Sequence, residues 1–305
     1  MDRLPVELVN HCIYFTDNPV AELSLVNKYF NNNVKGIRIT SNEDYPAMTD
    51  EHLPDLPNLT KLDLKGNQGI SDEGVTQLGK LTFLELGFHL NFMRGNTKSI
   101  MTDQSLSTLT SLTSLNLNYD KYITDKGISK LVNLVSLSLV ENSVRITNEG
   151  ISNLTNLQTL QIETNSSFDL SKLSQLTSLS LSDNANVISF RYLVNLRKLR
   201  LRYNKIISDE QISALTNLEE LDLSFNNKIT SIKHFTKLKT LNLFCNDLIS
   251  DHHISTLTNL EELDLSDNYT ITGQALQHLP CLKIVKLCYY QKLNNLNQRI
   301  KIVYV

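Results

Sequence analysis

The ten residues LTNLEELDLS occur twice in the chain, as Leu215–Ser224 and again as Leu257–Ser266. The two copies belong to a longer pattern, L-x-x-L-x-L-x-x-N, which recurs at steps of 19 to 31 residues. The pattern starts at Leu59, Leu81, Leu112, Leu134, Leu157, Leu176, Leu196, Leu218, Leu238, Leu260 and Leu282. An internal period of this length predicts a stack of repeats, in which each unit buries its leucines against its neighbours.

Each repeat has a constant first half. The L-x-L portion predicts a short strand whose leucines point inward and whose intervening residues point outward. The closing Asn is expected to satisfy backbone groups where the chain turns away, and this role is structural. The Asn positions are 67, 142, 165, 184, 204, 226, 246 and 268, and Asp120 takes the place of Asn once.

The second half of each repeat comes in two lengths. Repeats of 22 or 23 residues place Ser or Thr before Asp, as in ISDEQISAL from Ile207, which predicts a capped helix of one or two turns. Repeats of 19 or 20 residues, which begin at Leu157, Leu176 and Leu218, lack room for that helix. We expect their second halves to be extended or tightly coiled.

These features resemble leucine-rich repeats over residues 34–290. The resemblance implies an α/β solenoid of about 11–12 repeats. Such a solenoid is a right-handed horseshoe with a parallel sheet on its concave side and short helices on its convex side. Residues 291–305 are expected to form a C-terminal cap, and their alternating Ile300, Ile302 and Tyr304 predict one last strand.

Residues 1–33 do not follow the repeat and predict a small helical unit, which Pro5 opens and residues 17–19 interrupt. LPVEL from Leu4 and LSLVNKYF from Leu23 resemble the F-box motif. That family implies docking to the Skp-type adaptor of a cullin–RING ubiquitin ligase. The apolar residues available for docking are Leu4, Pro5, Leu8, Ile13, Val20, Leu23 and Val26. Alternatively, the unit only caps the first repeat, as every solenoid requires.

A protein partner is expected on the concave wall, where the outward residues of neighbouring strands form columns. Lys198 and Arg200 are predicted to lie beside Glu220 and Asp222, as exposed lateral ion pairs. Arg202 faces serines on both sides and is the best unpaired cation for an acidic or phosphorylated partner.

Two further groups of residues are candidate contacts. Tyr203 and Phe225 stand at the rim, one position before the Asn, and aromatic side chains are favoured interface anchors. They alternatively shield the Asn ladder. The partner-binding set on the repeats is Arg200, Arg202, Tyr203 and Phe225. The repeat that starts at Leu81 has an insertion over residues 87–101, with Phe92, Met93 and Arg94 as its contact residues. A neutral surface insertion is the alternative.

The composition describes a folded chain without a strong charge bias. The chain has 305 residues, of which 41% are hydrophobic and 20% charged, and its net charge is −3. This balance favours neither nucleic acid nor an anionic membrane as a partner. The start MDRLPVELVN does not resemble a secretory signal, and the four scattered cysteines indicate reduced thiols. We therefore expect a location in the cytoplasm, with the nucleus as an alternative, and not secretion.

No catalytic, metal-binding or cofactor-binding constellation stands out, so an enzyme is not predicted and no cofactor is expected. The pair His252–His253 is expected to lie on a solvated face. Two functions remain. The first is an F-box adaptor that selects protein substrates for ubiquitination. The second is a non-catalytic interaction scaffold whose N-terminal helices act only as a cap, since LTNLEELDLSFNNKIT also resembles internalin-type cell-surface repeats.

Overall fold

The computed structural model describes residues 36–38, 49–56, 58–64, 69–86, 101–140, 145–163, 167–182, 186–188, 190–294 and 296–305. The chain divides into two compact units, Met1–Asn156 and Leu157–Val305. The predicted F-box-like helices lie outside the described residues, and so does most of the insertion over residues 87–101.

The first unit is built from short parallel strands that alternate with single-turn helices. Its elements are β1 (Gly36–Arg38), the 3-10 helix η1 (Asp50–Asp55), β2 (Lys61–Asp63), α4 (Asp72–Thr76), β3 (Phe83–Glu85), α5 (Asp103–Leu106), β4 (Ser114–Asn116), α6 (Asp125–Ile128), β5 (Ser136–Val140) and α7 (Asn148–Ile151). Each strand pairs in parallel with the next, from β1 to β5. The helices likewise contact one another in sequence order, so the repeats stack.

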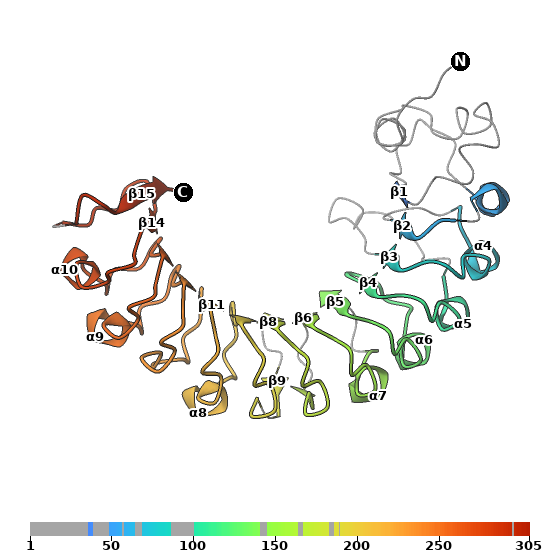
Figure 1. The fold of residues 1–305 in the computed structure, drawn as a ribbon, viewed down its shortest axis with the longest axis horizontal. Coiled ribbons are helices and arrows are strands. Elements are labelled where there is room, and N and C mark those ends of the chain that lie inside the picture. The colour runs from blue at the N-terminus through green and yellow to red at the C-terminus, as the bar shows by residue number, and fades with distance from the viewer. Residues whose placement is uncertain are drawn as a thin grey trace, which may run out of the picture. The chain divides into compact units, whose positions relative to one another are not determined.

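The second unit continues the same alternation. Its elements are β6 (Thr159–Glu163), β7 (Ser167–Phe168), β8 (Ser178–Ser182), β9 (Asn186–Val187), β10 (Lys198–Arg200), α8 (Asp209–Ile212), β11 (Glu220–Asp222), β12 (Thr240–Asn242), α9 (Asp251–Ile254), β13 (Glu262–Asp264), α10 (Gly273–Leu276), β14 (Ile284–Leu287) and β15 (Lys301–Tyr304). The parallel order is β6-β8-β10-β11-β12-β13-β14-β15. Within this unit, the strands lie on one side of the repeats and the helices on the opposite side (Figure 1). The expected last strand is present as β15.

A ladder of leucines forms the core of the second unit. Leu199, Leu221, Leu241 and Leu263 are register partners on β10 to β13, and each is at most 2% exposed. Truncation of such a leucine to alanine typically costs about 2–5 kcal/mol. The prediction that the leucines of each L-x-L pair point inward is therefore confirmed for these strands.

The short repeats replace the helix with extended chain, as their length predicted. Phe168 lies in β7, which pairs with β9 in a separate two-stranded sheet. Phe168, Phe190 and Phe235 are each at most 1% exposed, and they are the largest fully buried side chains of the described residues. A bulky aromatic ring thus occupies the interior of each repeat that has no helix.

The helices begin at the predicted caps, and these caps also bind the preceding repeat. Thr124 Oγ1 accepts a hydrogen bond from the Lys126 amide at the start of α6. Asp103 of the preceding helix accepts the Thr124 amide at 2.8 Å and the Thr124 hydroxyl at 2.5 Å. Equivalent pairs join Asp50 to Ser71, Asp72 to Thr102, Asp125 to Thr147, Asp209 to Thr230 and Asp251 to Thr272. Each aspartate therefore links two repeats, a role that the cap assignment had missed.

Two long repeats follow a short repeat and receive no such aspartate. In these two repeats, a side chain of the same repeat accepts the hydrogen bond from the backbone amide of the cap residue. The Ser208 amide donates to Gln211 Oε1 at 3.0 Å, and the Ser250 amide donates to His253 Nδ1 at 3.0 Å. Only His252 of the histidine pair is exposed. The expectation that both histidines are solvated is wrong for His253, because its ring closes a capping box.

The Asn ladder confirms the predicted structural role. Asn246 is buried, its Nδ2 donates to the carbonyl oxygens of Leu223 and Asn226, and its Oδ1 accepts the amides of Leu248 and Ile249. Asn204, Asn226 and Asn268 make equivalent bonds. Gln291 extends the ladder, since its Nε2 donates to the carbonyl oxygens of Leu265 and Asn268.

Candidate protein-binding face

The candidate site is the outward face of β10 to β14 in the second unit, here called the strand face. Residues on neighbouring strands stand in register, so Arg200, Asp222, Asn242, Asp264 and Lys286 form one row. A second row runs parallel to it through Lys198, Glu220, Thr240, Glu262 and Ile284. The columns predicted from the sequence are therefore confirmed for this unit.

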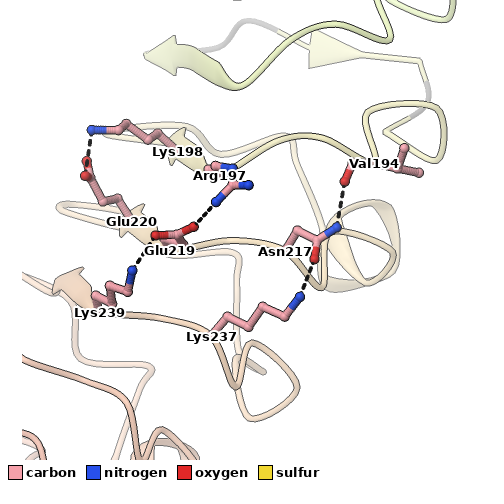
Figure 2. A network of polar contacts seen from close by, with 8 residues as sticks. All are labelled: Val194, Arg197, Lys198, Asn217, Glu219, Glu220, Lys237 and Lys239. Carbon is pink, nitrogen blue, oxygen red and sulfur yellow. Dashed lines mark hydrogen bonds and ion pairs between the residues drawn. The ribbon is translucent and has the colours of Figure 1, made fainter.

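At the amino-terminal ends of these strands, the charges neutralise one another (Figure 2). Glu219 accepts hydrogen bonds from Lys239 at 2.7 Å and from Arg197, and these bonds lower the pKa of Glu219. Lys283 pairs with Glu261 at 2.5 Å. The basic partners are largely exposed and Glu219 is half-buried, so each pair contributes only about 0–1 kcal/mol to stability. These charged side chains are therefore paired with one another within the protein.

Beside these pairs, Figure 2 shows hydrogen bonds between consecutive repeats that pass through the uncharged side chain of Asn217. Asn217 Nδ2 donates to the Val194 carbonyl oxygen at 2.8 Å, and Lys237 Nζ donates to Asn217 Oδ1 at 2.6 Å. Asn195 and Asn259 bind carbonyl oxygens of preceding repeats in the same way. The asparagine of LTNLEELDLS is therefore scaffold in both copies.

The expected lateral ion pairs form only in part. Lys198 Nζ lies 2.6 Å from Glu220 Oε1, as predicted. Arg200 and Asp222 are register partners, but the structure records no ion pair for either among the residues that it describes. Asp222 Oδ1 instead accepts the Ser224 amide at 2.9 Å, and Asp264 Oδ1 accepts the Ser266 amide at 3.0 Å. The row from Arg200 to Lys286 therefore keeps charges that are not neutralised by one another.

Arg202, Tyr203 and Phe225 are brought together at the carboxyl-terminal rim of β10 and β11. The rings of Tyr203 and Phe225 stack with centroids 4.3 Å apart, and Phe225 meets Phe244 edge-on at 4.7 Å. The Arg202 guanidinium lies 5.2 Å from the Tyr203 centroid and 5.6 Å from that of Phe225, within cation–π range. No ion pair is recorded for Arg202 in the described part of the chain, and its role in binding an acidic partner stays a prediction.

The backbone of this rim has an unusual conformation that the sequence pattern had not revealed. The φ angles are 56° at Tyr203 and 54° at Phe225, which is the left-handed region. The Tyr203 amide still donates to the Ser224 carbonyl oxygen, and the Phe225 amide donates to that of Phe244. The turn therefore extends the inter-strand bonding while it tilts both rings onto the rim. Phe244 completes the ring cluster and was not among the contact residues predicted from the sequence.

A second group of aromatic side chains lies near β14, and Tyr289 takes the position in its repeat that Tyr203 and Phe225 take in theirs. Tyr289 is 87% exposed, and its ring lies 6.0 Å from that of Tyr304. The hydroxyls of Tyr269 and Tyr290 both donate to Asp267 Oδ1, and the bond to Asp267 raises the pKa of Tyr290. Only the position of Tyr289 was visible in the repeat pattern.

The strand face contains a groove of about 180 Å³, whose lining includes Arg200, Asp222, Asn242, Asp264 and Lys286. Small-molecule sites typically enclose about 300–1,000 Å³ and are mostly apolar. This groove is smaller and charged, and it suits the side chains of a protein better than a whole small ligand. Among the described residues, His, Cys, Asp and Glu side chains form no group of three able to hold a metal ion.

The remaining predicted site residues lie outside the described residues. They are Leu4, Pro5, Leu8, Ile13, Val20, Leu23, Val26, Phe92, Met93 and Arg94. The described helices are also short, and none of them has the length and apolar character that crossing a bilayer requires.

Family models agree with the repeat geometry. The model described as leucine-rich repeats in two copies matches residues 194–237. The single leucine-rich-repeat model matches residues 55–79, 108–132, 234–252 and 256–279. The chain contains leucine-rich repeats. A search of curated proteins finds no significant match.

Several solved structures are similar to this chain in fold. An internalin (inlF) from Listeria monocytogenes is 22% identical with a TM-score of 0.63, and the match covers 96% of this chain and 93% of that chain. Internalin C2 from the same species is 29% identical with a TM-score of 0.50, over 64% and 83% of the two chains. A chain of the Toll–Spätzle complex from Drosophila is 20% identical with a TM-score of 0.56, over 79% and 35%.

Proposed function

We propose that this protein is a non-catalytic interaction scaffold, which binds a protein partner on the strand face of its leucine-rich repeats. The observation that carries the proposal is the contrast between the amino-terminal edge of the sheet and the strand face with its rim. At the amino-terminal edge, charges such as Glu219 are paired within the molecule. Along the strand face and its rim, Arg200 and Arg202 are exposed, and no ion pair is recorded for either among the described residues. Arg202 also lies beside the ring of Tyr203, which stacks on Phe225. Clustered aromatic and arginine side chains are typical anchors of protein interfaces.

Site-specific photo-crosslinking tests this proposal in cells that make the protein. A photoreactive amino acid at Thr240, in the middle of the strand face, is expected to capture a partner that mass spectrometry identifies. The same amino acid at Glu210, an exposed residue of α8 on the helix side, is the matched control. Capture of the same proteins from both positions, or from Glu210 alone, would contradict the proposal.

The adaptor function is a second proposal, and it rests on the sequence of residues 1–33. The match of LPVEL and LSLVNKYF to the F-box motif favours docking to a Skp-type adaptor through Leu4, Pro5, Leu8, Ile13, Val20, Leu23 and Val26. The repeats would then hold a substrate for ubiquitination, with Phe92, Met93 and Arg94 as additional contacts. This function places the protein in the cytoplasm or the nucleus.

A pull-down with purified Skp-type adaptor separates the two proposals. The full chain is expected to retain the adaptor, and the double variant Leu4→Ala, Pro5→Ala is expected to lose it. Retention by neither chain would leave residues 1–33 as a cap alone, and equal retention by both would show that Leu4 and Pro5 do not carry the docking. The scaffold proposal does not depend on this result, because its binding face lies on β10 to β14.

A further inference from the structure

The strand face has a charge order that is symmetric about β12. Along one register row, Arg200 on β10 is followed by Asp222 on β11, Asn242 on β12, Asp264 on β13 and Lys286 on β14. The order is therefore positive, negative, neutral, negative, positive. All five residues line the same groove, so a single bound segment can contact all of them.

The centre of this row suits a cation. Asp222 and Asp264 lie one strand to either side of Asn242, and each uses a single carboxylate oxygen to accept a backbone amide, as described above. Asn242 Oδ1 accepts the Phe244 amide at 2.9 Å and adds no charge. A lysine or arginine over Asn242 would have a carboxylate on both sides. Arg200 and Lys286, at the two ends of the row, suit carboxylates.

We propose that the strand face binds an extended segment of its protein partner, in which acidic residues flank a basic residue at a spacing of three. The proposal deepens the scaffold function and rests on it. Neighbouring strands lie about 4.8 Å apart, so Arg200 and Asn242 are separated by about 10 Å, and so are Asn242 and Lys286. A polyproline II chain, which is extended, advances about 3.1 Å per residue with three residues per turn, so residues three apart span the same distance and point to the same side. The predicted pattern is acid-x-x-base-x-x-acid, read across the strands.

The pattern has a consequence for direction. Because it is its own mirror image, the charges alone accept the segment in either orientation. The ring cluster of Tyr203, Phe225 and Phe244 at the β10 to β12 end includes two phenylalanines, whereas the described rings near β14 belong to tyrosines with polar hydroxyls. An apolar residue beside one of the two acids would therefore set the orientation.

Selection from a displayed library of random twelve-residue peptides tests the proposal with the full chain as bait. The wild-type protein is expected to enrich acid-x-x-base-x-x-acid. The variant Arg200→Glu, Asp222→Lys, Asp264→Lys, Lys286→Glu inverts the row without changing the net charge. It is expected to enrich the opposite pattern, base-x-x-acid-x-x-base, and to bind the wild-type peptides about tenfold more weakly or worse.

A second charge-neutral variant, Glu210→Lys with Lys237→Glu, is the control, since both residues are exposed and lie off the strand face. It is expected to enrich the wild-type pattern. Enrichment of peptides without this spacing, no enrichment, or the same peptides from the inverted variant would each overturn the proposal. The Thr240 crosslink reports the scaffold function separately. A captured partner that binds the inverted variant equally well would leave that function standing and refute the charge pattern.

Discussion

Asp103 occupies the space that a side chain at Gly127 would need. Its Oδ1 lies 2.5 Å from the position of a Cβ atom built on Gly127, while it accepts the Thr124 amide at 2.8 Å. Gly74 and Gly150 stand in the same relation to Asp50 and Asp125. The glycine in SDEG, TDKG and TNEG is therefore tied to the aspartate of the preceding repeat. Where that aspartate is missing, Gln211 or His253 stands at the glycine position.

The variant Gly127→Ala is expected to destabilise the protein by about 1–3 kcal/mol, because the new methyl group displaces the Asp103 carboxylate from Thr124. Gly79→Ala is the matched control, since no atom of the described residues lies within 4 Å of a Cβ atom at that position. It is expected to leave stability unchanged or raise it by about 0.4–1 kcal/mol. Urea unfolding followed by circular dichroism measures both. Equal effects of the two substitutions would contradict the assigned role of Asp103.

Asp120→Asn is expected to stabilise the protein at neutral pH by about 1 kcal/mol or more, because it supplies the missing donor of the Asn ladder. Asp120 is fully buried, and its Oδ2 has no hydrogen-bond partner among the described residues. Burial raises the pKa of Asp120 above its ordinary value of 3.8, against hydrogen bonds from the amides of Ile123 and Tyr122. The contribution of the protonated Asp120 side chain to folding stability is thus fully present below pH 3.8 and is lost as the pH rises through the folded-state pKa.

The advantage of the Asp120→Asn variant should therefore grow from pH 3 to pH 7 in chemical unfolding experiments. The reverse change, Asn246→Asp, is the control. It removes the amide that donates to Leu223 and Asn226 and is expected to destabilise the protein. A variant Asp120→Asn that is less stable than wild type at pH 7 would refute this account.

His253→Gln is expected to make stability less dependent on pH between about 7.5 and 5.5, because it copies the arrangement of Gln211 in an equivalent repeat. His253 Nδ1 can accept the Ser250 amide only while the ring is neutral. Desolvation and the neighbouring His252 lower the pKa of His253 below its ordinary value of 6.5. The stability from this bond is therefore present above pH 6.5 and is lost as the pH falls through the folded-state pKa.

Thermal melts of wild type and His253→Gln over this pH range check that prediction. The melting temperature of the wild type should fall more steeply on acidification than that of the variant. Since His234 is unchanged in both proteins and its pKa is also lowered, the difference between the two curves isolates His253. Parallel curves would show that the capping bond does not titrate.

Tyr203→Ala is expected to weaken binding of the partner captured at Thr240 about thirtyfold, as loss of an interface anchor typically does. Alanine retains a Cβ atom, so the left-handed backbone is no more strained than before. Tyr192→Ala is the matched control. Tyr192 is 41% exposed and lies beside Arg191, as Tyr203 is 39% exposed and lies beside Arg202, but Tyr192 is remote from the strand face. Calorimetric titration that finds equal affinity losses would remove Tyr203 from the interface.

The predictions that succeeded concern features that are local to one repeat. The strands, the buried leucines, the Asn turns and the Ser or Thr caps follow from spacing, because each needs only residues close in sequence. The lateral pair of Lys198 and Glu220 was predictable as well, since a parallel register follows once the repeats are aligned. Arg202 and Tyr203 were selected as candidate contacts because they differ from the matching residues of other repeats, and their role in binding stays a prediction.

The features that the sequence pattern did not predict each depend on two neighbouring repeats. The role of His253 follows from the absence of a carboxylate in the repeat before it, and the two-repeat role of Asp103 follows from the position of Thr124. The stack of Tyr203 on Phe225 likewise requires the left-handed turns of both strands. No single repeat contains these relationships.

The sequence by itself determined that this chain stacks repeats, because a leucine period needs neighbours to bury it. It also determined which residues point outward. Only the tertiary structure decided which outward charges remain without an ion pair, because side-chain geometry pairs Lys198 with Glu220 and leaves Arg200 beside Asp222. The proposed binding face depends on which of these charges form ion pairs with one another. That pairing results from how the repeats stack in three dimensions.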